Sequence, residues 1–230
     1  MNVVVTGGTT RLGKAIADHL REKGWRVVTT SHRADAGADV VADFAKPGEV
    51  VRAYLKILNL LGGQPPDALV NNAALFTGDA ATLEAVNFDA PAKLTTLMAS
   101  RECGTGSVVN ILDSRVLNQD LSPFHRRGSG RSLPVTLRGQ TPYEKTKLQL
   151  LGETLRQAAM FAETLRVNAV APGPVLAPTG VHEKAGETPL GRPTPRDVAE
   201  AVAFLLAAKA TTGAIVPVDG GQSLLGSLAP

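Results

Sequence analysis

The sequence predicts a doubly wound α/β fold, in which helices cover both faces of a parallel sheet. Short runs rich in β-branched residues alternate along the chain with longer segments whose apolar residues recur at helical spacing. The short runs are apolar at nearly every position, which is typical of strands buried on both faces. The 230 residues fit one domain of this class, and we expect residues 1–230 to form it.

Seven strands and five helices are expected, each bounded by turn residues or by a change of hydrophobic period. The strands are expected at Asn2–Thr6, Arg26–Ser31, Asp39–Ala42, Ala68–Asn71, Ser107–Leu112, Arg166–Ala171 and Ala214–Val218. The helices are expected at Arg11–Lys23, Gly48–Leu61, Asn87–Arg101, Pro142–Glu163 and Pro195–Ala208.

Two long segments interrupt this alternation, and each follows a predicted strand. Residues 114–142 contain Ser-Pro, Gly-Ser-Gly and a cluster of arginines, and residues 172–193 are rich in proline and glycine. Loops of such length are uncommon in a compact domain unless they bind or cover a ligand. Ligands of doubly wound sheets bind at the carboxyl edge of the strands. We therefore expect an inserted basic loop at about 114–142 and a substrate loop at about 172–193.

Composition excludes several classes of protein. Hydrophobic residues make up 43% and charged residues 20% of the chain, as in a globular protein with a buried core. The longest apolar runs are shorter than the roughly 20 residues that cross a bilayer, and no basic segment precedes the first apolar run. We expect a cytoplasmic protein without a membrane partner. The lone cysteine, Cys103, cannot form an internal disulfide, and we expect it to be a buried apolar residue.

The net charge of +3 raises the question of nucleic-acid binding. Aromatic residues, at 4%, offer few platforms for stacked bases. The positive charge is concentrated in the inserted segment, which holds Arg115, Arg126, Arg127, Arg131 and Arg138 against Asp120 alone. Because the rest of the chain is close to neutral, we expect no nucleic-acid partner. The arginines are interpreted as a lid or an anion contact beside the site, with a merely solvated loop as the alternative.

The first predicted strand runs directly into a glycine-rich turn, Thr6-Gly7-Gly8-Thr9-Thr10-Arg11-Leu12-Gly13, and then into a helix. Glycine serves where the backbone has positive φ or approaches a phosphate, and the helix N-terminus offers free N–H groups to an anion. The turn therefore suits a dinucleotide pyrophosphate. A tight connection without a ligand is the alternative.

This turn resembles the T-G-x-x-x-G-x-G turn of short-chain dehydrogenases/reductases, with Arg11 in place of the middle glycine. Further motifs of that family follow in order: Ala42-Asp43-Phe44, Asn71-Asn72-Ala73, Asn87, Tyr143-Glu144-Lys145-Thr146-Lys147, Pro172-Gly173 and Val218-Asp219-Gly220-Gly221. The resemblance covers nearly the whole chain. It implies a Rossmann-like seven-stranded parallel sheet and an oxidoreductase that uses a nicotinamide dinucleotide.

The resemblance also implies which residues hold the cofactor. Asp43 would meet the adenine, and Asn71 and Ala73 would line the dinucleotide. The predicted cofactor-binding residues are Gly7, Thr9, Arg11, Leu12, Gly13, Ser31, His32, Arg33, Asp43, Phe44, Asn71, Ala73, Tyr143, Lys147, Pro172 and Gly173.

The residues after the second predicted strand favour NADPH over NADH. An NAD site usually has an acidic residue there for the ribose hydroxyls, whereas an NADP site needs positive charge for the 2′-phosphate. The chain has Ser31-His32-Arg33, and the arginine fork can bind phosphate bidentately. Asp35 lies close by and speaks against the assignment, and a solvated basic loop is the alternative.

Tyr143 and Lys147 are four residues apart, so they share one face of the predicted helix. A lysine ammonium near the phenol favours the phenolate, and we expect it to lower the pKa of Tyr143 and allow proton exchange near neutral pH. By the resemblance, Lys147 also holds the nicotinamide ribose and Asn87 anchors a water in a proton relay. The predicted catalytic residues are Asn87, Asp113, Tyr143 and Lys147.

Asp113 stands where the family usually has a serine that holds the substrate carbonyl. A carboxylate stabilises an oxyanion poorly, but it can relay protons or accept hydrogen bonds from a nitrogen-rich ring, so the substrate is interpreted as an imine. Alternatively, Asp113 merely caps a turn and Ser114 fills the serine role. Asp113 and Tyr143 are also 30 positions apart, much further than in the family, which indicates an insertion between them.

Within the family, Arg11, His32-Arg33, Phe76 and the aspartate together resemble pteridine reductases. That resemblance implies that Phe76 stacks on the pterin and that Arg11, Phe76, Asp113 and Tyr143 bind the substrate. Taken alone, Phe76 would more often be a core residue. The predicted reaction is NADPH-dependent hydride transfer to a C=N bond of a pteridine-type substrate, with Tyr143 as proton donor.

Two other functions stay open. One is an NADPH-dependent carbonyl reductase of the same family that acts on a 3-oxoacyl group, a ketone or a sugar. The other is a dinucleotide-binding regulator without turnover. The sequence has no zinc motif, nucleophilic triad or P-loop lysine, so we expect no metal site. The resemblance further implies a homotetramer.

Overall fold

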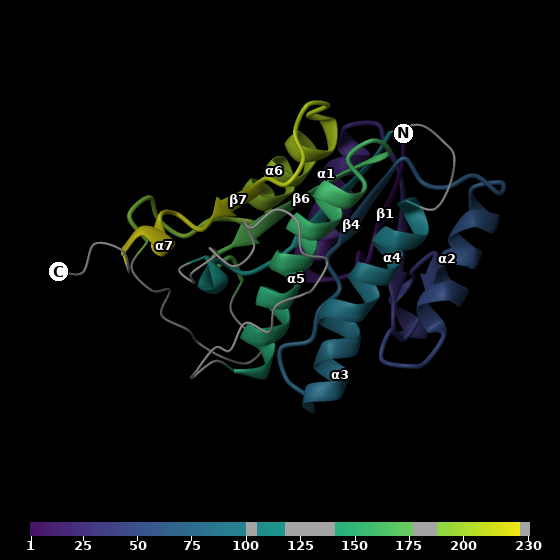
Figure 1. Cartoon of the computed structure of the whole chain (residues 1–230), viewed down its shortest axis with the longest axis horizontal. Coiled ribbons are helices and arrows are strands. Elements are labelled where there is room, and N and C mark those ends of the chain that lie inside the picture. Colours follow the sequence, from purple (N-terminus) through teal and green to yellow (C-terminus); the bar gives the residue numbers. More distant parts are fainter. Residues whose placement is uncertain (100–104, 118–140, 177–187, 226–230) are drawn as a thin grey trace.

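The computed structural model describes residues 1–99, 105–117, 141–176 and 188–225. Within this part of the chain, seven strands form one parallel sheet in the order β3-β2-β1-β4-β5-β6-β7 (Figure 1). The predicted doubly wound parallel class is confirmed. The strands are β1 (Asn2–Val5), β2 (Arg26–Ser31), β3 (Val40–Val41), β4 (Ala68–Asn71), β5 (Gly106–Ile111), β6 (Leu165–Pro172) and β7 (Ile215–Val218).

Helices cover both faces of the sheet because alternate strand residues point to opposite sides. Val3 and Val5 of β1 pack under α1 (Arg11–Glu22) and α6 (Pro195–Ala207). Val4 belongs to the core on the other face, beneath α2 (Glu49–Leu60) and α4 (Ala90–Ala99). Figure 1 shows α5 (Pro142–Met160) beside α4 on that same face.

The helix expected from Asn87 begins earlier, at Ala80. It comprises α3 (Ala80–Glu84), a π-helical turn η2 (Ala85–Asp89) and then α4. Asp79 caps the start, because its side chain accepts a hydrogen bond from the Thr82 N–H at 2.9 Å. Pro91 has no N–H to complete regular helical bonding, and the wider turn lies directly before it.

Further differences concern segment ends and short elements. α5 ends at Met160 instead of Glu163. Three short helices were not predicted: the 3-10 turns η1 (Ala34–Ala36) and η3 (Ser114–Val116), and α7 (Gln222–Leu225). Predicted features that lie outside the described residues are the end of the third helix at Arg101, Cys103, the substrate-loop residues 177–187 and most of the basic segment, 118–140 with Arg126, Arg127, Arg131 and Arg138. No helix among the described residues is long and apolar enough to span a membrane.

Candidate active site

A cavity of about 790 Å³ opens at the carboxyl edge of the sheet, lined by residues that follow β1, β2, β4, β5 and β6. Such edges are where doubly wound sheets bind ligands, and the volume falls within the usual range of small-molecule sites. Predicted cofactor residues that line it are Gly7, Thr9, Arg11, Leu12, Gly13, Ser31, His32, Arg33, Asp43, Phe44, Ala73, Tyr143, Lys147, Pro172 and Gly173.

Glycine is required in the turn between β1 and α1. A Cβ atom on Gly13 would lie 2.1 Å from the Gly7 carbonyl oxygen, and Gly7 itself has a φ of 63°. Arg11 also has a positive φ, 49°, which is uncommon for a residue with a side chain. The turn thus folds back tightly, so that the first N–H groups of α1 border the cavity, in an arrangement suited to a pyrophosphate.

The segment at the end of β2 carries the residues predicted to set the preference for NADPH over NADH. Ser31 is buried and its hydroxyl accepts a hydrogen bond from the Arg33 N–H at 3.1 Å. The guanidinium of Arg33 forms a forked pair with Asp35, at 3.0 and 2.6 Å, and this arginine lowers the pKa of Asp35. Because both side chains are exposed, this ion pair is weak, and Arg33 can exchange Asp35 for a phosphate.

Tyr143, Asp113 and Lys147 lie close together in the lining of this cavity. The Tyr143 hydroxyl donates a hydrogen bond to Asp113 Oδ2 at 3.1 Å. Lys147 Nζ donates to the Ile111 carbonyl oxygen at 2.8 Å and lies 5.9 Å from the centre of the Tyr143 ring. α5 supplies Tyr143 and Lys147 from one face, and a capping box at Thr141 fixes where that helix begins.

The electrostatics of this cluster differ from the expectation. Burial, and then the charge of Asp113, raise the pKa of Tyr143 well above 10, so the predicted lowering by Lys147 is wrong in this arrangement. Complete burial also lowers the pKa of Lys147 to about 8, which weakens this lysine as a counter-charge. The Tyr143 phenol therefore keeps its proton at neutral pH, even beside the Asp113 carboxylate.

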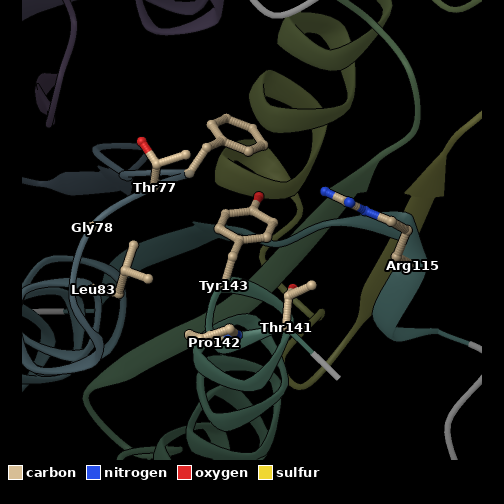
Figure 2. A pocket seen from close by; sticks show the side chains of 8 residues that line it. Thr77, Gly78, Leu83, Arg115, Thr141, Pro142 and Tyr143 are labelled. Atoms are coloured by element: carbon tan, nitrogen blue, oxygen red, sulfur yellow. The ribbon is translucent and has the colours of Figure 1, made fainter. Parts of the chain in front are cut away.

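Arg115 joins this cluster, although the sequence indicated it only as part of the basic segment. Its Nε and Nη2 atoms donate to the two Asp113 oxygens at 3.0 and 2.9 Å. Its guanidinium carbon lies 5.3 Å from the centre of the Tyr143 ring. Figure 2 shows Arg115 reaching toward Tyr143 from one side, with Thr77 and Leu83 on the other.

Phe76 is 64% exposed, so it is not a core residue. Its ring stacks on that of Tyr143 with centroids 4.6 Å apart and an interplanar angle of 18°. The pair forms part of the wall of a second, smaller pocket of about 340 Å³, which is shown in Figure 2 and also lined by Thr77, Gly78, Leu83, Arg115, Thr141 and Pro142. An exposed flat ring beside Tyr143 offers a stacking surface to a flat ligand.

Two predicted residues, Asn71 and Asn87, do not line either pocket. Asn71 is buried, and its amide donates to Asn110 Oδ1 at 2.8 Å. The side chain of Asn87 bonds the backbone N–H and carbonyl of Leu75, each at 2.8 Å, and donates to the Thr146 hydroxyl at 3.1 Å. Asn87 therefore joins the segment before Phe76 to α5, which carries Tyr143 and Lys147.

The alternative role of Ser114 can be compared with that of Asp113. Asp113 does cap the turn, since it accepts a hydrogen bond from the Arg115 N–H, but it also bonds Tyr143 and lines the larger cavity. Ser114 is buried, its hydroxyl donates to Gln222 at 3.4 Å, and it lines neither pocket. The geometry favours Asp113 as the residue in the serine position.

Several cavity residues were not predicted from the sequence. They are mostly apolar side chains or neighbours of predicted ones: Thr10, Thr30, Ala42, Ala45, Asn72, Ala74, Leu75, Thr82, Val86, Ile111, Leu112, Val175 and Leu176. Asn72 could have been found from its motif. Its amide donates to the Thr6 and Gly7 carbonyl oxygens at 2.9 and 3.3 Å and holds the glycine turn against the end of β4. The described residues contain no His, Cys, Asp and Glu cluster suited to a metal ion.

Known proteins identify the family. A family profile described as "Enoyl-(Acyl carrier protein) reductase" matches residues 129–223. The chain is 30% identical to "Short-chain dehydrogenase/reductase SDRA" of Arabidopsis thaliana over 245 residues, which cover 95% of this chain and 93% of that relative. The chain belongs to the short-chain dehydrogenase/reductase family. It is an oxidoreductase dependent on a nicotinamide dinucleotide, as its motifs predict.

Two solved structures of this fold carry such cofactors. FolM alternative dihydrofolate reductase 1 from Brucella canis, complexed with NADP, has a TM-score of 0.74 and 29% identity over 97% of this chain and 94% of that one. The 3-alpha-hydroxysteroid dehydrogenase from Pseudomonas sp. B-0831, complexed with NADH, has a TM-score of 0.81 and 25% identity over 100% of both chains. This short-chain dehydrogenase/reductase is thus similar to proteins with different substrates.

Proposed function

We propose that this enzyme is an NADPH-dependent reductase that transfers hydride to a C=N bond of a pteridine-type substrate. The observation that carries the proposal is the hydrogen bond from Tyr143 to the Asp113 carboxylate, beside the exposed ring of Phe76. A carboxylate can accept hydrogen bonds from the ring N–H groups of a pteridine, whereas it stabilises a developing oxyanion poorly. The similarity to FolM supports the same substrate class.

The residues that line the larger cavity fit NADPH. The glycine turn and the N-terminus of α1 suit the pyrophosphate, while Ser31, His32 and Arg33 suit the 2′-phosphate. Asp43 would meet the adenine, and Lys147 would hold the nicotinamide ribose. When bound, NADPH supplies a hydride, that is, a proton with two electrons, to the carbon of the C=N bond. The FolM structure with NADP supports this choice over NADH, and the hydroxysteroid dehydrogenase with NADH speaks against it.

Tyr143 supplies the proton of the reaction. Its phenol gives a proton to the substrate nitrogen, so that C=N becomes CH–NH, and the resulting phenolate takes a proton from water. The raised pKa of Tyr143 keeps the phenol protonated until substrate arrives. Asp113 holds the hydroxyl in place, and Lys147 ties α5 to the end of β5. Asn87 ties α5 to the segment before Phe76, and Arg11 and Phe76 bind the substrate ring.

The test is NADPH oxidation with dihydrobiopterin, dihydrofolate, dihydromonapterin and an acetoacetyl thioester as separate substrates. Turnover of a dihydropteridine with a higher kcat/KM than the thioester supports the proposal. Turnover confined to the thioester would reject it. Tight NADPH binding without any turnover would indicate a regulator instead. Replacing NADPH by NADH in the same assay tests the cofactor, and equal kcat/KM for the two would reject the NADPH assignment.

A carbonyl reductase of the same family is the second candidate function. The similarity to the 3-alpha-hydroxysteroid dehydrogenase favours a C=O substrate. Against this candidate, the Asp113 carboxylate faces Tyr143 at the position where reduction of a C=O bond would need a neutral hydrogen-bond donor. Asp113→Ser separates the two: it should lower kcat for a pteridine, whereas it should raise kcat for a ketone.

We further propose that residues 1–230 form one domain whose basic segment 114–142 and loop 172–193 flank the site. Their described ends support this, because Arg115 and Thr141 line the smaller pocket and Pro172 and Leu176 line the larger one. By its family resemblance, we also propose a homotetramer, which light scattering would test. A cytoplasmic location accords with a reductase that draws on cellular NADPH, and cell fractionation would test it.

A further inference from the structure

We propose that Arg115 is a positioning residue for the proton on Tyr143, and that it supplies the positive charge at the phenol that the motif Tyr-x-x-x-Lys assigns to Lys147. The inference rests on the proposed function, since it takes Tyr143 as the proton donor. It concerns a residue outside the family motifs found in this sequence.

Contacts of Arg115 fix the carboxylate that Tyr143 faces. The guanidinium fork holds both Asp113 oxygens at 3.0 and 2.9 Å, and the Arg115 backbone N–H donates to Oδ1 at 3.0 Å. The Tyr143 hydroxyl donates to the other oxygen, Oδ2. Because the fork is planar and bidentate, it holds the carboxylate in one orientation. Arg115 thus orients the Asp113 carboxylate toward the Tyr143 hydroxyl.

A second contact joins Arg115 to the start of α5. Its Nη1 atom lies 3.8 Å from Glu144 Oε1, and the side chain of Glu144 also accepts hydrogen bonds from Thr141 in the capping box. Glu144 directly follows Tyr143. The turn after β5 and the first turn of α5 are therefore tied together at Tyr143 and at Glu144.

The charged groups packed against Tyr143 come from two elements in the described part of the chain. Asp113 and Arg115 come from the turn after β5, and Glu144 and Lys147 come from α5. The segment after β4 contributes Phe76 and Thr77, which do not titrate in this range. Arg115 lies closer to the centre of the ring than Lys147, at 5.3 Å against 5.9 Å.

Arg115 is also the more constant charge of the two. A guanidinium stays protonated throughout the working pH range, and Asp113 raises the pKa of Arg115 further. Lys147 is buried, its ammonium is bonded to the Ile111 carbonyl, and its pKa falls to about 8. At mildly alkaline pH, Arg115 keeps its charge while Lys147 loses part of its own. Arg115 thus opposes the effects of burial and of Asp113 on the Tyr143 phenol.

The test follows the ionisation of Tyr143 itself. The chain has two tyrosines, so Tyr54→Phe leaves Tyr143 as the sole signal in ¹³C-tyrosine NMR. Tyr54 is on α2, away from the cluster. After burial, the Asp113 carboxylate is the next cause of the raised pKa of Tyr143, so adding Asp113→Asn brings the titration to lower pH. It also leaves no unpaired carboxylate at position 113 when Arg115 is changed.

In this double-variant parent, Arg115→Gln should move the Tyr143 midpoint upward by about one pH unit. Arg115→Lys should restore part of the shift, because it returns the positive charge beside the phenol. Arg156→Gln is the matched control, since Arg156 makes the same forked pair with Glu153 on α5 and should leave the midpoint unchanged. An equal midpoint for parent and Arg115→Gln, or an equal effect of Arg156→Gln, would overturn the proposal.

A kinetic measurement in the otherwise unaltered enzyme gives an independent readout. Arg115→Gln should lower kcat about tenfold or more and shift the pH profile of kcat, while Arg115→Lys recovers part of kcat. An unshifted pH profile would contradict the proposal. Because the NMR titration uses no substrate, its outcome is independent of whether the substrate is a pteridine or a carbonyl compound.

Discussion

At the scale of single residues, Tyr143 is the group on which the proposed chemistry depends. Tyr143→Phe keeps the stack with Phe76 but removes the proton, so kcat should fall by roughly 10²–10⁴-fold while the Kd of NADPH stays within about twofold. Pre-steady-state reduction and NADPH fluorescence titration would measure the two quantities. A variant that retains more than about a tenth of kcat would show that another group donates the proton.

Lys147 gives a prediction for stability. Its pKa in the folded state, about 8, lies below the 10.5 of a free lysine. Folding therefore carries a cost that is fully present below pH 8 and is lost as the pH rises through 10.5. Lys147→Met removes this cost, about 3 kcal/mol, but leaves the Ile111 carbonyl without its partner, which offsets about 1 kcal/mol.

Lys147→Met should thus unfold in urea with a free energy about 2 kcal/mol higher than the unaltered enzyme at neutral pH, although it loses activity. The difference should shrink as the pH rises toward 10.5. Lys56→Met is the control, because Lys56 is an exposed lysine of α2 and its substitution should leave the free energy of unfolding nearly unchanged. A lower stability of Lys147→Met at neutral pH would contradict the prediction.

Arg33 gives a prediction for cofactor preference. Arg33→Ala removes the fork proposed for the 2′-phosphate, so kcat/KM should fall about tenfold or more for NADPH and stay nearly constant for NADH. Asp35→Asn should act in the opposite direction, because it releases Arg33 from its carboxylate partner and removes a negative charge from the rim. Equal losses with both cofactors would indicate a general defect of the loop.

At the scale of elements, the turn between β1 and α1 allows a sharp test. Gly13→Ala places a Cβ atom 2.1 Å from the Gly7 carbonyl and 2.5 Å from the amide of Asn72, so the turn must open. We expect NADPH binding to weaken at least about tenfold and the free energy of unfolding to fall by about 2 kcal/mol or more. Lys14→Ala, on the exposed side of the same helical turn, should change neither quantity appreciably.

The sequence predicts elements well where one local pattern decides them. All seven strands were expected, because short, nearly continuous runs of β-branched residues are typical of strands buried on both faces of a parallel sheet. The helix at Ala80 was missed because its start depends on the Asp79 cap, and the π-helical turn depends on Pro91. These signals are single residues, and they compete with a longer apolar pattern that begins at Asn87.

The site shows the same division between local and long-range signals. Motifs at fixed spacing, such as the glycine turn and Tyr143 with Lys147, could be placed in advance. The raised pKa of Tyr143 could not, because it depends first on burial in the folded chain and then on a carboxylate 30 positions away. The pairing of Asp113 with Arg115 is local in the sequence. Its effect on Tyr143, however, depends on α5 lying against the turn after β5.

At the scale of the whole molecule, the distribution of charge predicts for which substrates the KM depends on salt concentration. The excess positive charge of the chain lies in the basic segment, and its described ends border the smaller pocket. If this segment attracts anions, changing Arg126, Arg127, Arg131 and Arg138 together to Gln should raise the KM for dihydrofolate, whose glutamate tail is anionic, by roughly threefold to tenfold at low salt. The KM for dihydrobiopterin, whose side chain is uncharged, should not change.

A matched variant separates a local effect from one of net charge. Arg21, Arg52, Arg156 and Arg196 are at least 46% exposed and lie on helices outside the pockets, so changing these four to Gln removes the same charge from other parts of the surface. It should leave both KM values unaltered, and added salt should abolish the difference between the two variants for dihydrofolate. An equal rise of KM in both variants would mean that net charge alone attracts the substrate. No rise in either variant would mean that the basic segment is only a solvated loop.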